Sequence, residues 1–152
     1  MDTKFSVGLH VLSMIAESQK PLTSSFLATS VGTNPSYVRK VIGLLKQASL
    51  ISSQQGKSGY SLTRLASDMS LLEIYLATQE LDHIHLFDIH QNGNQDCPVG
   101  RYIEASLSPL FQDIEMSLAK SLSHQSLQDV IDRLYQTKER KDKNESSSSN
   151  KL

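Results

Sequence analysis

Hydrophobic positions recur every three or four residues through much of the chain, which is the period of one face of an α-helix. The first such segment, FSVGLHVLSMIAES, starts at Phe5 and ends before Pro21, a residue that helix interiors do not tolerate. A second, short helix is predicted over TSSFLATSVG, with Thr23 or Ser24 as its N-cap and Gly32 suited to a left-handed end.

A third helix is predicted to start at Asn34-Pro35, where a capping side chain precedes a residue whose missing N–H costs nothing in the first turn. Its buried stripe is predicted to consist of Val38, Val41/Ile42 and Leu45. Its opposite side is predicted to carry Ser36, Arg39, Lys40, Gly43 and Gln47. Because a tight turn containing Gly32 separates the second and third helices, the pattern indicates a helix-turn-helix.

The pattern then changes to alternation over LISSQQGKSGYSL, where QQGKSG supplies a turn between two short strands. A lone hairpin is marginally stable, so it must pack on the helices as a wing. The sequence therefore predicts a mainly α fold with a small β-hairpin, in which a winged helix-turn-helix domain occupies residues 1–66.

A long helix is predicted in the second half. A fourth helix, SLLEIYLATQE, precedes HLFDIH, which could be a short strand, and Pro98 then opens the long pattern, with Pro109 expected to kink or split it. A helix of about 24 residues spans about 36 Å, more than the width of the small N-terminal unit, so its stripe calls for a second chain. The predicted dimer-interface residues are Ile103, Leu107, Leu110, Ile114 and Leu118.

Ser126 and Asp129 have the spacing of a capping box, which predicts a last helix through Val130, Ile131 and Leu134. Residues 67–136 are therefore expected to comprise a linker, the long helix and this C-terminal helix, together forming a dimerisation and sensor region. Residues 137–152 are polar and repetitive, and we expect a disordered tail there.

Charge is divided unevenly along the chain, although the net charge is −1. Residues 1–66 carry seven Lys and Arg against two carboxylates, whereas residues 67–137 carry three against eleven. A basic first half indicates a face for a polyanion, and a helix-turn-helix with a wing is suited to double-stranded DNA.

The predicted DNA face lies at the N-terminal end of the third helix and at the tip of the wing. Arg39 can pair with guanine or phosphate, and Lys57 is a flexible point charge suited to phosphate or the minor groove. For Tyr37, packing against the second helix and contact with phosphate both stay open. The candidate DNA-binding residues are Thr23, Ser24, Ser25, Asn34, Ser36, Tyr37, Arg39, Lys40, Gln55, Lys57, Ser58 and Tyr60.

The segments FSVGLHVLSMIA, LATSVGTNPSYVRKVIGLLKQASLISSQQGKSGYSLTR and MSLLEIYLAT resemble the Rrf2 family of bacterial transcription regulators. NQDCPVG through IEASLSPLFQDIE resembles the YwnA-like branch of that family, and the resemblance covers residues 1–136. It implies a winged-helix homodimer with crossing long helices that binds a palindromic operator as a repressor. Members that sense iron or nitric oxide hold an iron–sulfur cluster with three cysteines, but this chain has Cys97 only, so we expect no cofactor.

Cys97 and nearby histidines leave the sensed signal open. Cys97 precedes Pro98 at a helix start, where the thiolate is favoured, so an oxidant or electrophile sensor is one hypothesis. A metal-responsive regulator that uses His83, His85, His90 and Cys97 is an alternative, although a strand would place His90 opposite the other two histidines. The effector is not identified.

Other classes of function follow less readily from the sequence. A winged-helix protein-interaction module stays an alternative, whereas the sequence has no Gly-rich phosphate loop, HExxH or GxSxG, so we expect no enzyme. No apolar run approaches the roughly 20 residues of a membrane helix, and the N-terminus lacks a signal-peptide pattern, so we expect a cytoplasmic protein.

Overall fold

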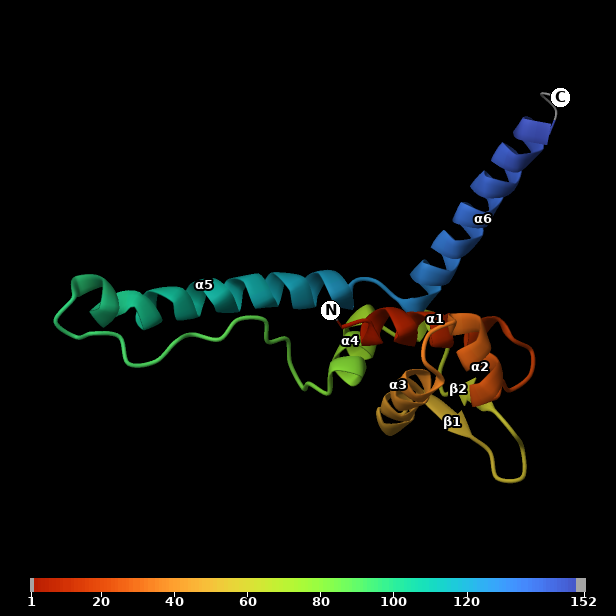
Figure 1. Ribbon diagram of the computed structural model, residues 1–152, viewed down its shortest axis with the longest axis horizontal. Helices are drawn as coiled ribbons and strands as arrows, with labels where there is room; N and C mark the ends of the chain where they lie inside the picture. Colours follow the sequence, from red (N-terminus) through yellow and green to blue (C-terminus); the bar gives the residue numbers. More distant parts are fainter. Residues whose placement is uncertain (1, 150–152) are drawn as a thin grey trace.

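The computed structural model describes residues 2–149 and contains six α-helices, one short 3₁₀ helix and a two-stranded sheet within that range. The elements are α1 (Lys4–Glu17), α2 (Ser24–Val31), α3 (Pro35–Gln47), β1 (Ile51–Ser53), β2 (Tyr60–Leu62), η1 (Ala66–Asp68), α4 (Leu71–Gln79), α5 (Pro98–Ser123) and α6 (Leu127–Ser149). Helices α1–α4 and the hairpin form a head, from which α5 and α6 project in different directions (Figure 1). The predicted fold class, a mainly α winged helix-turn-helix with a long C-terminal helix, is confirmed.

The helix-turn-helix forms through the local signals that predicted it. Gly32 ends α2 in the left-handed conformation, with φ of 75°, and its N–H donates to Ala28 O at 3.1 Å. Asn34 caps α3, since its Oδ1 accepts the Ser36 N–H at 2.8 Å. These two caps fix the turn, so α2 and α3 pack as a unit over Leu27 and Val38, both fully buried.

The wing is tied to the head by a contact that the sequence pattern did not predict. Strands β1 and β2 pair antiparallel, with Ile51 opposite Leu62 and Ser53 opposite Tyr60. Tyr60 also pairs with Leu22, whose O accepts the Tyr60 N–H at 2.9 Å. Gly59, at φ of 103°, permits this approach, because a Cβ there would lie 2.8 Å from the carbonyl carbon of Pro21. The loop before α2 therefore holds the base of the wing.

Helix α5 is continuous over 26 residues, so Pro109 does not split it. Residues 81–97 contain neither helix nor strand, and they follow α5 to its far end (Figure 1). Leu86 N–H donates to Glu115 Oε1 at 3.0 Å, and the Phe87 and Phe111 rings lie 4.9 Å apart. The strand considered for HLFDIH is therefore wrong: side chains of α5 hold this segment, and no neighbouring strand pairs with it in the part of the chain that is described.

Helix α6 begins inside the core of the head and ends far from it. The predicted capping box forms, with Ser126 N–H donating to Asp129 Oδ2 at 2.8 Å and Asp129 N–H to Ser126 Oγ at 3.2 Å. Leu127 and Ile131 are buried against η1 and α1. The helix continues through Ser149, so the disordered tail expected over residues 137–152 is wrong for residues 137–149, and residues 150–152 lie outside the described residues. Lys138, Glu139, Arg140 and Lys141 have high helix propensity, so they extend a helix whose first turns are already fixed.

Candidate nucleic-acid interface

The first turns of α3 separate buried from exposed side chains sharply. Val38, Val41 and Ile42 are buried, whereas Arg39 and Lys40 between them are exposed. Arg39 Nη2 donates weakly to Ser36 Oγ at 3.4 Å, so both side chains lie on the same exposed side. This arrangement leaves two cations at the helix end that would enter a groove.

The two capping residues on the candidate list have structural roles in the free protein. Thr23 Oγ1 accepts the Phe26 N–H at 3.2 Å at the start of α2, as Asn34 does for α3. Of the two neighbouring candidates, Ser24 is half-buried and Ser25 is exposed. The caps fix where both helices begin, and the partial positive charge at these N-termini favours phosphate.

Tyr37 packs through its ring and also presents its hydroxyl to other side chains, and its contact with phosphate stays a prediction. Its half-buried ring packs against the core. Its hydroxyl donates to Asp2 Oδ1 at 3.3 Å and accepts from Thr3 Oγ1 at 3.2 Å. Sequence reasoning missed Asp2 and Thr3, because 34 and 35 residues separate them from Tyr37 and no local pattern links them.

The tip of the wing is exposed, whereas its base is not. Gln55, Lys57 and Ser58 are exposed, and the Lys57 N–H donates to Gln54 O at 3.1 Å, which closes the turn. Tyr60 is half-buried and packs against the core of the head. Of these candidates, the three tip residues are free to reach a ligand without rearrangement.

Ion pairs distinguish the cations of the head. Arg64 Nη2 lies 2.6 Å from Glu73 Oε1, and Lys4 Nζ lies 3.0 Å from Asp2 Oδ2. Among residues 2–149, none of the ion pairs within 4.0 Å involves Arg39, Lys40 or Lys57. The three cations predicted to contact DNA therefore lack a carboxylate partner among these ion pairs of the described residues, as do Lys20 and Lys46, whereas Lys4 and Arg64 are paired.

Cys97 is an exposed free cysteine at the N-cap of α5. The backbone N–H groups of Gly100 and then Val99 face its sulfur and lower the pKa of the thiol. Gly100 also packs closely on the preceding loop, since a Cβ there would lie 2.6 Å from Asn94 O. The geometry favours a reactive thiolate at the far end of α5.

The histidines do not assemble with Cys97. His83 pairs with Asp82 and His85 with Asp88, each at 2.6 Å, and the Asp88 carboxylate raises the pKa of His85. Within the described range there is no group of three or more His, Cys, Asp or Glu side chains placed to hold a metal ion. With one cysteine in the chain, these residues do not fit an iron–sulfur cluster either.

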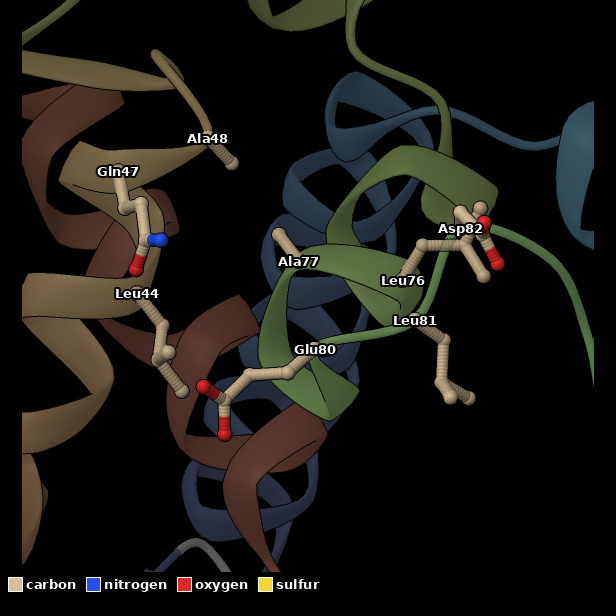
Figure 2. A pocket seen from close by; sticks show the side chains of 8 residues that line it. All are labelled: Leu44, Gln47, Ala48, Leu76, Ala77, Glu80, Leu81 and Asp82. Carbon is tan, nitrogen blue, oxygen red and sulfur yellow. The ribbon is translucent and has the colours of Figure 1, made fainter.

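A groove of about 530 Å³ lies at the other end of α3, between its last turn and the last turn of α4. Leu44 and Gln47 line one side and Ala77 and Glu80 the other (Figure 2). The groove is separated from Ser36 by most of the length of α3, so it is distinct from the predicted DNA face. No local pattern predicts this groove, because the packing of α3 against α4 creates it.

Comparison with known proteins identifies the class of this chain. The profile of the Rrf2 family, described as an iron-dependent transcriptional regulator, matches residues 1–133. YwnA of Bacillus subtilis (strain 168), named as an HTH-type transcriptional regulator, is 38% identical over 135 residues, covering 89% of this chain and 99% of that protein. YffB of Lactococcus lactis subsp. lactis (strain IL1403), also named as an HTH-type transcriptional regulator, is 29% identical over 131 residues and covers 82% of both chains.

Solved structures agree in fold. A crystal structure described as that of a DNA-binding protein has a TM-score of 0.68 and 35% identity, and covers 84% of this chain and 98% of that one. CymR, the global cysteine regulator of Bacillus subtilis, has a TM-score of 0.65 at 17% identity, covering 88% and 96% of the two chains. No helix among residues 2–149 is long and apolar enough to cross a membrane.

Proposed function

The chain belongs to the Rrf2 family of transcriptional regulators, which bind DNA, and we propose that it acts as a homodimeric repressor that reads a palindromic operator with α3 and the wing. The observation that carries this proposal is the first half of α3. There Arg39 and Lys40 are exposed and without a carboxylate partner in the described chain, directly beside the buried stripe that fixes the helix in the head.

The homodimer is supported by the apolar face of α5. None of its 26 residues is fully buried, and Leu110 and Ile114 are 51% and 42% exposed. An exposed apolar stripe of this length is typical of an interface, and a second copy of the chain carries the same stripe to pack against it. A twofold dimer places two α3 helices to read successive major grooves, about 34 Å apart, so its operator is a palindrome.

Cys97 is the proposed sensor. Its lowered thiol pKa and its exposure suit reaction with oxidants or electrophiles. In the proposed step, the Cys97 thiols of two chains lose two protons and two electrons to a diamide-class oxidant and form an intermolecular disulfide. That bond changes the arrangement of the α5 helices and hence the spacing of the reading heads.

The deciding experiment is selection of bound duplexes from a random pool with the purified full-length chain, with and without diamide. We expect a palindromic consensus whose affinity falls on oxidation, and no fall for Cys97→Ser. Absence of any enriched duplex and of salt-dependent binding would point to a protein-interaction module. An equal response of Cys97→Ser and wild type would remove the thiol from the mechanism.

A further inference from the structure

The start of α1 lies against the predicted DNA face. There the Asp2 carboxylate binds the Lys4 ammonium and the Tyr37 hydroxyl, two groups that could otherwise bind phosphate. Asp2 Oδ2 lies 3.0 Å from Lys4 Nζ, and Asp2 Oδ1 accepts the Lys4 N–H at 2.8 Å. The same Oδ1 accepts the Tyr37 hydroxyl at 3.3 Å. Since Tyr37 is in the first turns of α3, beside Ser36, this cluster lies at the rim of the reading head.

We propose that Asp2 limits the affinity of the reading head for DNA by holding the Lys4 ammonium and the Tyr37 hydroxyl away from phosphate. The inference rests on the proposed function and adds Lys4 to the groups that contact DNA when they are released. The phosphate backbone competes with Asp2 for the same two donors, and Asp2 also repels phosphate directly.

The cluster favours this role over a purely structural one for two reasons. The side chains of Lys4 and Asp2 are 21% and 40% exposed, so a ligand can reach them, and a surface pair of this kind contributes little to folding. Asp2 is also the foremost of the groups that raise the pKa of Lys4, ahead of Tyr37 and Glu80. Removing the Asp2 charge therefore takes away the carboxylate that lies 3.0 Å from the Lys4 ammonium.

Asp2→Asn is the sharpest variant, because Asn keeps the Oδ1 acceptor for the Lys4 N–H and removes only the charge. In the untagged full-length chain, we expect a gain in operator affinity of about two- to fivefold for each reading head. The slope of log affinity against log salt should steepen by about one for each head as Lys4 engages phosphate. Asp132→Asn, on exposed α6, is the matched control and should change neither quantity.

Lys4→Met separates release of Lys4 from loss of repulsion. If Lys4 is the released group, Asp2→Asn in the Lys4→Met background no longer steepens the salt slope and most of the affinity gain disappears. The inference is overturned if Asp2→Asn leaves affinity and slope unchanged, or if its full gain persists with Lys4→Met. If the wild-type chain binds no duplex at all, the proposed function fails and this inference fails with it. If wild type binds but Asp2→Asn has no effect, only this inference fails. Thermal unfolding of each variant checks that the fold is retained.

Discussion

Arg64 and Glu73 join the end of the wing to the start of α4. Arg64 Nη2 lies 2.6 Å from Glu73 Oε1, while Arg64 Nη1 donates to Asp68 O at 2.9 Å. Glu73 completes a capping box, because its Oε2 accepts the Ser70 N–H at 3.1 Å and its own N–H donates to Ser70 Oγ at the same distance. One carboxylate therefore caps α4 and anchors the strand that carries the wing.

This contact makes stability depend on pH in a predictable direction. Burial raises the pKa of Glu73, but the Arg64 guanidinium and the Ser70 N–H outweigh it, so the pKa of this carboxyl lies below its ordinary value. A carboxyl whose folded pKa is depressed stabilises the fold above its unfolded pKa, and this stabilisation is lost as the pH falls through the folded value. We expect Glu73→Gln to lower the free energy of unfolding by about 0.5 kcal/mol at pH 7, since the pair is 41% exposed on both sides.

Urea unfolding of wild type and Glu73→Gln at pH 7 and pH 3 measures this effect. Gln keeps an oxygen acceptor for the cap, so the difference between the two proteins reports the charge and should be smaller at pH 3 than at pH 7. Glu139→Gln, on the exposed part of α6, is the control. A difference of equal size at both pH values would contradict the assignment.

Elements with local signals were predictable, and contacts between distant residues were not. Gly32, Asn34 and Pro35 gave the helix-turn-helix because capping and turn chemistry act within a few residues. The Leu22–Tyr60 bridge and the Asp2–Tyr37 contact join residues more than 30 positions apart, so no periodicity reveals them. The buried stripe of α3 predicts which of its side chains are exposed, and the site candidates on α3 and the wing could be predicted in this way. Their contacts with DNA stay predictions.

Two predictions for the second half of the chain differ from the structure for a common reason. A strand over HLFDIH and a disordered tail were expected from composition and short patterns, which do not report what a segment packs against. In the structure, Glu115 and Phe111 of α5 hold the first segment as an extended chain. Burial of Leu127 and Ile131 fixes the first turns of α6, and the polar tail continues that helix. Tertiary contacts decided the conformation of the first segment, and in α6 they fixed only the first turns, from which the helix continues through the polar residues.

Arg39 is predicted to carry sequence preference. Arg39→Ala should lower operator affinity by about 1–3 kcal/mol and relax preference at one position of each half-site, because a bidentate contact to a base edge is lost. Arg39→Lys should keep most of the salt dependence but lose the preference, since an ammonium cannot form the fork. Repeating the duplex selection with both variants tests this. An unchanged consensus with Arg39→Ala would remove Arg39 from base readout.

Lys57 is predicted to bind phosphate without sequence preference. It is exposed at the tip of the wing, beside Gly56, whose φ of 81° gives the turn its shape. Lys57→Ala should weaken binding to operator and unrelated duplexes alike, and should reduce the salt slope by about one for each reading head. Titrations at several salt concentrations measure this, with Lys120→Ala on α5 as control. Loss confined to the operator would show that Lys57 reads bases.

The homodimer is predicted to depend on the stripe of α5 that contains Leu110 and Ile114. Ile114→Glu places a carboxylate where the second chain should pack, and an unpaired charge in an apolar interface is strongly unfavourable. Because Ile114 is already 42% exposed in the single chain, the substitution should leave the fold of the head intact. We therefore expect sedimentation equilibrium to show a monomer for Ile114→Glu where wild type is a dimer, with unchanged helical circular dichroism per residue.

Met116 provides the matched control for this prediction. It is 70% exposed on the same helix, two residues further along, so its side chain points away from the Leu110–Ile114 stripe. Met116→Glu adds the same charge but should leave the dimer intact. Operator affinity should fall for Ile114→Glu alone, since one reading head contacts only one half-site. A dimer that survives Ile114→Glu but not Met116→Glu would place the interface on the opposite face of α5, and the palindrome would then be read with a different separation of the two α3 helices.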